Sequence, residues 1–208
     1  VPRARFRISS LEIVELAEDL LDVMSASGGR VCPHLHLPLQ SGDPRILRAM
    51  KRPYTPADFL EAIDRARARL DEPALTTDVI VGFPGETEES FGNTLGLCRH
   101  VGFSRLHVFP FSPRNGTPAA EMPGRPHSAH VTDWTRRLRA VGKDMAEQFA
   151  RRWVGRRVEV VPERVLDEER AIGYTERYVK AAVPRPTEVA KRLRVRAHAY
   201  RDGRLQCQ

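Results

Sequence analysis

The stretch "TTDVIVGFPGETEESF", residues 76–91, passes from β-branched residues through a Gly-Phe-Pro-Gly turn into an acidic segment. Val79, Ile80 and Val81 predict a buried strand end. Gly82 and Gly85 lack a Cβ, so the backbone can turn sharply there and approach a ligand closely. The stretch therefore predicts a strand, a shelf of backbone groups and a helix. An ordinary βα turn without a ligand is the alternative.

The acidic segment carries the signals of a helix start. Thr87 is a suitable N-cap residue, and Glu88 and Glu89 lie in the first turn, where the helix dipole favours negative charge. Apolar spacing predicts further elements on both sides of this unit. We expect strands at 5–9, 30–39, 75–83 and 105–113, and helices at 11–26, 43–52, 56–70 and 87–103.

Strands that alternate with helices indicate an α/β fold with a parallel sheet. Four strands cannot close a barrel, so the sheet is either open or lacks preceding strands. Each predicted strand ends in polar or conformationally permissive residues, which are Ser9 and Ser10, Gln40 to Gly42, Gly82 to Glu86, and Ser112 to Arg114. In parallel sheets ligands bind beyond the strand ends, so this edge is the predicted site.

The last part of the chain has a different pattern. Residues 128–152 predict an amphipathic helix with one apolar stripe, formed by Val131, Trp134, Leu138, Val141, Met145 and Phe149. From about residue 153 short strands follow, and Asp202-Gly203 is typical of a type I′ hairpin turn. Leu193, Val195, Ala197 and Ala199 alternate with Arg194, Arg196 and His198, which predicts a small barrel with a basic outer surface.

Composition sets the class of protein. The chain has 208 residues, of which 41% are hydrophobic and 29% charged, which indicates a globular, cytoplasmic protein without a membrane span. It begins with neither Met nor a signal peptide, so we expect an internal segment of a longer protein. Cys32, Cys98 and Cys207 are too scattered for a disulfide framework and are expected to be reduced.

Charge is distributed unevenly. Residues 1–126 contain 15 basic and 16 acidic residues, whereas residues 127–208 contain 19 basic and 11 acidic residues. The basic excess of the second part favours a polyanionic partner, and a merely solvated basic surface is the alternative.

Three segments, taken in order, carry a resemblance to a known family: "CPHLHLPLQSGDPRILRAMKRPYT", "TTDVIVGFPGETEESF" and "LHVFPFSPRNGTPAAEMPG". Together they resemble the C-terminal half of the radical S-adenosylmethionine (SAM) methylthiotransferases. "RISSLE" and "GYTERYVKAAV" are most similar to the branch that modifies threonylcarbamoyladenosine at position 37 of tRNA, beside the anticodon. The resemblance implies part of a radical SAM barrel at 1–126, a connecting helix at 127–152 and an OB-like TRAM domain that binds RNA at 153–208.

The resemblance also implies cofactors and partners. The intact enzyme would use SAM and two 4Fe-4S clusters to methylthiolate tRNA, with a flavodoxin-like or ferredoxin-like electron donor. The chain has no CxxxCxxC motif, and its cysteines lie 66 and 109 residues apart, so neither cluster is expected to bind here. We expect the chain alone to be inactive. A different radical SAM enzyme and a non-catalytic RNA-binding module are the alternatives.

Seven residues are candidates for binding SAM. By resemblance, Val79, Ile80, Val81 and Gly82 form the strand that contacts the adenine, and Asp78 lies just before it. Ser10 and Gln40 lie at the loop ends of their strands, where they can donate hydrogen bonds to the ribose or methionine moiety. Capping or turn formation is the alternative role for Ser10.

Two residues are candidates for contacting the substrate. His34 and His36 project from one face of an extended segment, but no third metal ligand is evident, so we predict no metal site and place His36 near the substrate. Arg114 ends the last strand, where its guanidinium can pair with a phosphate or a nucleoside carboxylate. An ion pair with Glu86 or Glu121 is the alternative.

The small barrel supplies the candidates for RNA binding. Aromatic rings beside basic residues are typical of RNA-binding barrels, because bases stack on the rings and phosphates pair with the charges. The candidates are Tyr174, Arg177, Tyr178, Lys180, Arg194 and Arg196.

Overall fold

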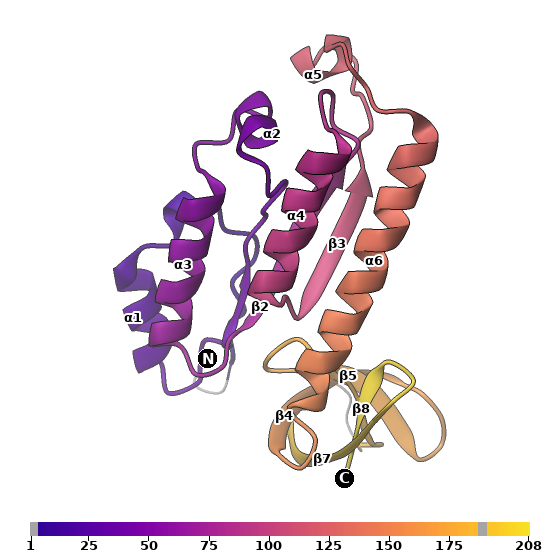
Figure 1. Cartoon of the computed structure of the whole chain (residues 1–208). Coiled ribbons are helices and arrows are strands. Elements are labelled where there is room, and N and C mark those ends of the chain that lie inside the picture. Colours follow the sequence, from indigo (N-terminus) through magenta and orange to yellow (C-terminus); the bar gives the residue numbers. More distant parts are fainter. Residues whose placement is uncertain (1–3, 187–190) are drawn as a thin grey trace.

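A computed structural model describes residues 4–186 and 191–208 (Figure 1). The predicted domains extend over residues 1–3 and 187–190, which lie outside the described residues. The helices are η1 (Ile13–Glu15), α1 (Glu18–Ala26), α2 (Pro44–Ala49), α3 (Pro56–Arg69), α4 (Glu88–Val101), α5 (Pro118–Glu121) and α6 (Ser128–Arg151). The strands are β1 (His34–His36), β2 (Ala74–Val81), β3 (Arg105–Pro110), β4 (Arg157–Val165), β5 (Arg170–Thr175), β6 (Lys180–Pro184), β7 (Leu193–Arg201) and β8 (Arg204–Cys207).

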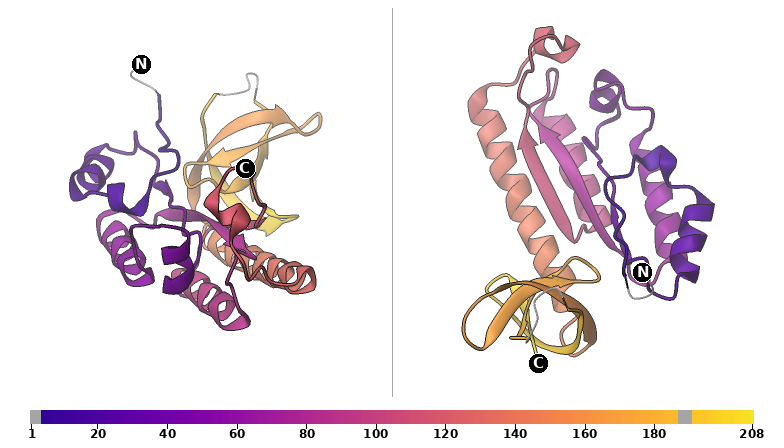
Figure 2. Two further views of the ribbon diagram at one scale, coloured as in Figure 1. Left: turned by 90° about the horizontal axis from the view of Figure 1, so that it is seen from above. Right: turned by 180° about the vertical axis from the view of Figure 1, so that it is seen from behind.

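The first part is an α/β unit with a parallel sheet in the order β1-β2-β3, as predicted. Residues of β2 alternate in their surroundings. Leu75, Val79 and Val81 join the buried core, whereas Asp78 and Ile80 are partly exposed on the other face. Helices α3, α4 and α6 lie along one face of the sheet, and the view from above shows the small barrel on the other side (Figure 2).

Two predicted elements in this unit were wrong. The expected strand at 5–9 is reduced to isolated parallel bridges that pair Phe6 with Val31 and Ser10 with His36, so the described sheet has three strands. The expected helix at 11–26 divides into η1 and α1, because Ala17 has an extended backbone. Val14, within the range of the expected helix, is 62% exposed.

Helix α4 forms as its sequence predicts. Thr87 and Ser90 form a capping box at the first turn, and Gly102 ends the helix in the left-handed conformation. The ring of Phe91 stacks on Trp134 of α6 at 5.3 Å, and the Trp134 indole donates to Glu88. These contacts attach α6 to the helical face of the sheet.

Helix α6 links the sheet to the second unit. Trp134, Leu138 and Met145 of its predicted stripe are buried in the core of the sheet, and Phe149 is buried in the core of the small barrel. The predicted amphipathic helix is therefore confirmed, and it serves both cores. The short helix α5 within the proline-rich segment was not predicted.

The second unit is a closed antiparallel barrel in the order β4-β5-β6-β8-β7, except that β6 and β8 are parallel. Gly173 is required in β5, because a Cβ there would lie 1.9 Å from the carbonyl oxygen of Val161. Asp202 and Gly203 have φ angles of 53° and 72°, as the predicted type I′ turn requires. The barrel lies beyond the amino-terminal ends of β1–β3, at the opposite end from the predicted ligand edge (Figures 1 and 2).

No helix among the described residues is long and apolar enough to span a membrane.

Candidate cofactor site and nucleic-acid surface

The loop after β2 is held by its own side chains. Gly82 has a φ of +85°, and its N–H donates to the carboxylate of Glu86. A Cβ at Gly82 would lie 2.7 Å from Val131 of α6, so glycine is required here for packing as well as for the turn. The turn and the packing against Val131 therefore explain this glycine without a ligand. Gly85 donates to the carbonyl of Gly124 at 2.9 Å, which fastens a second loop onto this one.

Glu86 is the buried acid of this loop. The residue is only 5% exposed, and burial raises the pKa of its carboxyl group to about 7. One oxygen accepts from Gly82, and the other has no hydrogen-bond partner among the described residues. An ion pair between Arg114 and Glu86 or Glu121, the alternative raised for Arg114, does not occur among the described residues.

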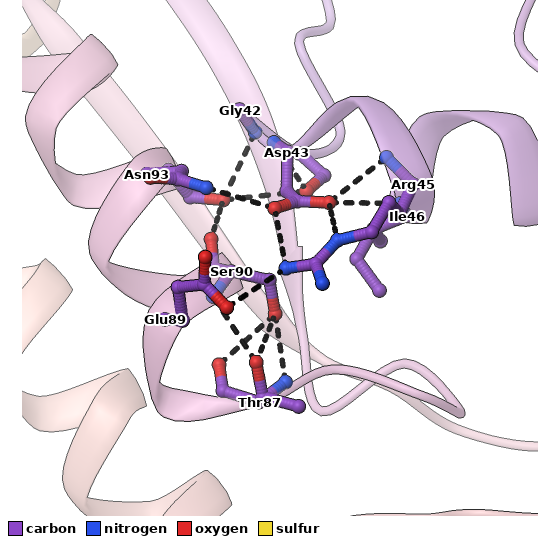
Figure 3. A network of polar contacts seen from close by, with 10 residues as sticks. Gly42, Asp43, Arg45, Ile46, Thr87, Glu89, Ser90 and Asn93 are labelled. Atoms are coloured by element: carbon purple, nitrogen blue, oxygen red, sulfur yellow. Dashed lines mark hydrogen bonds and ion pairs between the residues drawn. The ribbon is translucent and has the colours of Figure 1, made fainter.

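The loop after β1 is clamped onto the start of α4 (Figure 3). Asp43 caps α2 by accepting from the N–H groups of Arg45 and Ile46, and it also accepts from Asn93 of α4 at 2.8 Å. Gly42 donates to Thr94 at 2.9 Å, and a Cβ at Gly42 would lie 2.7 Å from the Thr94 Cα. These contacts fix the loop that begins at Gln40. Sequence reasoning missed this clamp, although "SGDP" before a helix is a capping signal.

Gln40 occupies an unusual backbone position. Its φ is +63°, although it is not a glycine, and such a conformation costs on the order of 1 kcal/mol or more. Its backbone bridges to β2, donating to Asp78 and accepting from Ile80, both at 2.9 Å. A strained residue at the carboxyl edge of the sheet is typical of a functional site.

The other SAM candidates divide by the direction of their side chains. Ile80 is partly exposed on the open face, and Ser10 is exposed beside His36. The side chains of Val79 and Val81 are fully buried in the helical core. Val79 and Val81 can therefore reach a ligand on the open face only through backbone groups.

A cluster of titratable side chains lies on the open face below this edge. Asp78 lies 3.3 Å from His36 Nε2 and 3.0 Å from His107 Nδ1. His34 shares the face with His36, as predicted, but it is buried. Burial, with Arg7 and His36 nearby, lowers the pKa of His34 to about 3. His107 was missed, although the alternation in "LHVFPF" could have indicated that it faces Asp78.

Some of the RNA-binding candidates contact the sheet unit, and others lie exposed on the surface of the small barrel. Arg177 was expected to contact RNA, but its side chain is only 10% exposed. Its guanidinium donates to the carbonyls of Asp71 and Glu72 at 3.0 and 3.1 Å and lies 4.0 Å from the Trp153 ring. The Arg177 side chain therefore joins the barrel to the turn before β2.

Tyr178 is also engaged between the two units. It has a φ of +59°, and its ring contacts His34 at 5.1 Å and the Arg7 guanidinium at 4.7 Å. Tyr174 stacks on it at 4.7 Å. Tyr174 and Lys180 are partly exposed and line a cavity of 270 Å³ with Arg105.

Arg194 and Arg196 remain on the outer surface of the barrel. The side chain of Arg194 is 80% exposed and pairs with Glu159 at 2.7 Å. Arg196 is exposed, and its Nε donates to the carbonyl of Gly155. Arg114, at the far end of the molecule, is also exposed, and no described residue pairs with its guanidinium.

Known proteins are similar in sequence to this chain. Residues 2–98 match the family described as the radical SAM superfamily. A threonylcarbamoyladenosine tRNA methylthiotransferase of Bacillus subtilis is 37% identical over 180 residues, which are 85% of this chain and 40% of that protein. The chain belongs to the radical SAM methylthiotransferase family. A tRNA-2-methylthio-N(6)-dimethylallyladenosine synthase of Corynebacterium efficiens is 37% identical over 97% of this chain and 34% of that protein. A synthase of the same name from Parafrankia is 44% identical over 76% of this chain and 32% of that protein.

Two solved structures share the fold. Coproporphyrinogen III oxidase of Escherichia coli, a radical SAM enzyme, matches with a TM-score of 0.55 at 22% identity over 71% of this chain and 33% of that chain. Elp3 of Methanocaldococcus infernus matches with a TM-score of 0.50 at 12% identity over 99% of this chain and 66% of that chain. The parallel sheet is therefore part of a radical SAM barrel. The chain spans 40% or less of the length of the curated relatives described above.

The family implies SAM and 4Fe-4S clusters as cofactors, and the residues present fit only the first. The strained Gln40 and the unpartnered oxygen of buried Glu86 lie on the two loops at the carboxyl edge of the sheet. By contrast, Cys32, Cys98 and Cys207 are all buried, and burial raises the pKa of Cys98 to about 12 and that of Cys207 to about 11. Buried thiols that lie in separate places do not form a cluster site.

Proposed function

We propose that this chain is the part of a tRNA methylthiotransferase that holds late strands of the catalytic barrel and a TRAM domain. In this proposal residues 1–126 form the last part of the radical SAM barrel, and residues 153–208 form the TRAM domain that binds RNA. Residues 127–152 form the helix that connects the two domains. The observation that carries it is the extent of the match. Similarity to a tRNA-modifying enzyme runs over 97% of the chain, from the sheet through the small barrel.

The proposed substrate is threonylcarbamoyladenosine at position 37 of tRNA. This nucleoside has a carboxylate on its threonyl group, whereas dimethylallyladenosine has only an apolar group at the same place. Arg114 is exposed at the carboxyl edge of the sheet, and its guanidinium has no ion-pair partner among the described residues. A free guanidinium there favours the substrate with a carboxylate, because the two groups form paired charge-assisted hydrogen bonds.

The proposed cofactor residues act by binding and orientation. Gln40 and Ser10 would hydrogen-bond SAM, and the backbone of Asp78 to Gly82 with the side chain of Ile80 would hold its adenine. Bound beside a reduced cluster, SAM would supply the radical that removes a hydrogen atom from C2 of the adenine in the substrate nucleoside. In the intact enzyme a flavodoxin-like or ferredoxin-like protein would provide the electron, and residues outside this chain would hold both clusters.

Methylthiolation of dimethylallyladenosine is the second candidate. Relatives named for that reaction match as well as the threonylcarbamoyladenosine relative, with 44% identity over 157 residues in Parafrankia. In this alternative Arg114 would contact a phosphate of the anticodon loop instead of the modified base.

The full-length enzyme that contains this chain tests the proposal. After anaerobic cluster reconstitution, it is given SAM, a reductant and tRNA with either threonylcarbamoyladenosine or dimethylallyladenosine, and the nucleosides are analysed by mass spectrometry. We expect the methylthio product from the first tRNA only. Arg114→Met should reduce that product at least about tenfold, since a charged pair is lost. Arg48→Met, a change of another exposed arginine, should leave it unchanged. Product from the dimethylallyl tRNA alone would favour the second candidate.

A further inference from the structure

Three neighbouring parallel strands each place one metal-binding side chain on the open face of the sheet. His36 ends β1, Asp78 lies in the middle of β2, and His107 lies in the middle of β3. In the strand register Asp78 lies opposite His107, and His36 lies opposite Thr76, two residues before Asp78. One Nδ1 or Nε2 of each histidine and one Asp78 oxygen all lie within 4.8 Å of one another.

We propose that His36, Asp78 and His107 bind a divalent first-row transition metal ion such as Zn²⁺ or Fe²⁺. Two histidines and one carboxylate are the ligand set that these ions use when they keep an open position. This inference goes beyond the proposed function, since neither SAM binding nor tRNA recognition requires it.

The distances between the ligand atoms fit such an ion. His36 Nε2 lies 3.3 Å from Asp78 Oδ2, and His107 Nδ1 lies 3.0 Å from Asp78 Oδ1. A tetrahedral Zn²⁺ ion with bonds of about 2.0 to 2.1 Å separates its ligand atoms by roughly 3.3 to 3.4 Å. The two distances end on different Asp78 oxygens, and the ligand atoms of the two histidines lie within 4.8 Å of each other, so the side chains would move closer together around one ion.

A hydrogen bond on the far side of the His36 ring supports this assignment. Thr76 donates to the carbonyl of Leu35, and its oxygen lies 2.9 Å from His36 Nδ1. In that arrangement His36 Nδ1–H donates to Thr76, so Nε2 presents a lone pair toward the Asp78 carboxylate. A metal ion placed between Nε2 and the carboxylate would be bound by both groups. Such outer partners commonly orient metal-binding histidines.

The site is open on one side. The side chains of His36, Asp78 and His107 are 13, 28 and 36% exposed, and they face away from the helical core. Helices α3, α4 and α6 lie along the other face of the sheet (Figure 2). A bound ion would therefore keep at least one position for water or for a substrate oxygen or nitrogen.

The chain itself, with no iron-sulfur motif to compete for metal, is the protein to test. We expect it to retain one Zn²⁺ ion per chain after dialysis against excess Zn²⁺, and Co²⁺ to give the visible absorption of a low-coordinate complex. His36→Gln, Asp78→Asn and His107→Gln should each weaken binding at least about tenfold, and Thr76→Val should weaken it less.

The matched control is the other close histidine pair. His127 and His130 have ring centroids 6.4 Å apart on α6, and changing both to Gln should leave binding unchanged. Far-UV circular dichroism checks that each variant folds. If Asp78→Asn does not fold, the partly exposed His107→Gln decides the question. The proposal is overturned if no ion is retained, if the three ligand variants bind as the parent does, or if only the control loses the ion.

Discussion

Glu86 gives the loop after β2 a pH-dependent stability. Burial raises the pKa of this carboxyl group from 4.5 to about 7, so the folded state binds its proton more tightly than the unfolded chain does. Its contribution is therefore fully present below about pH 4.5 and is lost as the pH rises through about 7. The loss from pH 4.5 to 8 is on the order of 3 kcal/mol in the free energy of unfolding.

Glu86→Gln should remove this pH dependence while keeping an oxygen for the N–H of Gly82. Denaturant unfolding at pH 5 and pH 8 measures it, with exposed Glu121→Gln as the control. An equal pH dependence in the parent and in Glu86→Gln would show that this carboxyl group titrates normally.

Gly82 and Gly85, in the same loop, differ in why glycine is required: the backbone conformation favours glycine at both, and packing favours it only at Gly82. Both have a φ of +85°, so any side chain is strained at either position. Only at Gly82 would a Cβ meet Val131, at 2.7 Å, whereas at Gly85 no atom lies within 4 Å. Gly82→Ala should therefore be more destabilising than Gly85→Ala, by about 1 to 3 kcal/mol.

Adding Val131→Ala should remove most of that difference, because the added methyl group then has space. Urea unfolding of the single and double variants measures the coupling. Additive effects of Gly82→Ala and Val131→Ala would contradict the packing explanation.

At the scale of elements, Arg177 joins the small barrel to the sheet. Its donors reach two carbonyls and two carboxylates, and its guanidinium covers the ring of Trp153. Arg177→Ala should leave these acceptors without partners and cost on the order of 2 kcal/mol or more in the free energy of unfolding. The Trp153 fluorescence should change, because the cation leaves the ring.

The matched control is Arg170→Ala in the same barrel, an exposed arginine paired with Asp167. It should cost less than about 1 kcal/mol. Equal losses for both variants would contradict a joining role for Arg177.

The elements predicted correctly are those whose signals are local. The capping box of α4, the stripe of α6 and the turn at Asp202-Gly203 each depend on residues close in sequence. The expected strand at 5–9 did not form, because strand pairing depends on a distant neighbour that local patterns do not contain.

The candidate site shows the same division. The carboxyl edge was predictable from where each strand ends. The clamp between Asp43 and Asn93 and the pairing of Asp78 with His107 depend on register between distant segments. Arg177 was predicted to contact RNA because it lies beside Tyr174 and Tyr178, but the carbonyls that it contacts lie more than 100 residues earlier in the chain.

At the scale of the whole molecule, basic charge gathers at the end that carries the small barrel. Arg194 and Arg196 are exposed there, so each can neutralise a phosphate and release counterions. Changing both to Ala in this chain should weaken tRNA binding and flatten the slope of log affinity against log salt by about one to two units. Filter binding at several salt concentrations measures the slope.

Arg48 and Arg136, exposed arginines on α2 and α6, provide a control with the same change in charge. Changing both to Ala should alter the slope less. If the two double variants behave alike, the barrel surface is no more than a solvated basic face.

The small barrel and the carboxyl edge of the sheet lie at opposite ends of the molecule, so one long, anionic substrate could contact both (Figure 1). The barrel would hold the tRNA at one end, while the carboxyl edge of the sheet would meet SAM and the modified base at the other (Figure 1). The most direct test is mass spectrometry of tRNA nucleosides from cells with and without the gene for the full-length protein. We predict that its loss removes 2-methylthio-threonylcarbamoyladenosine and leaves the unmodified threonylcarbamoyladenosine in its place. Unchanged levels of that methylthio nucleoside, with loss of another methylthio nucleoside or of none, would contradict the account.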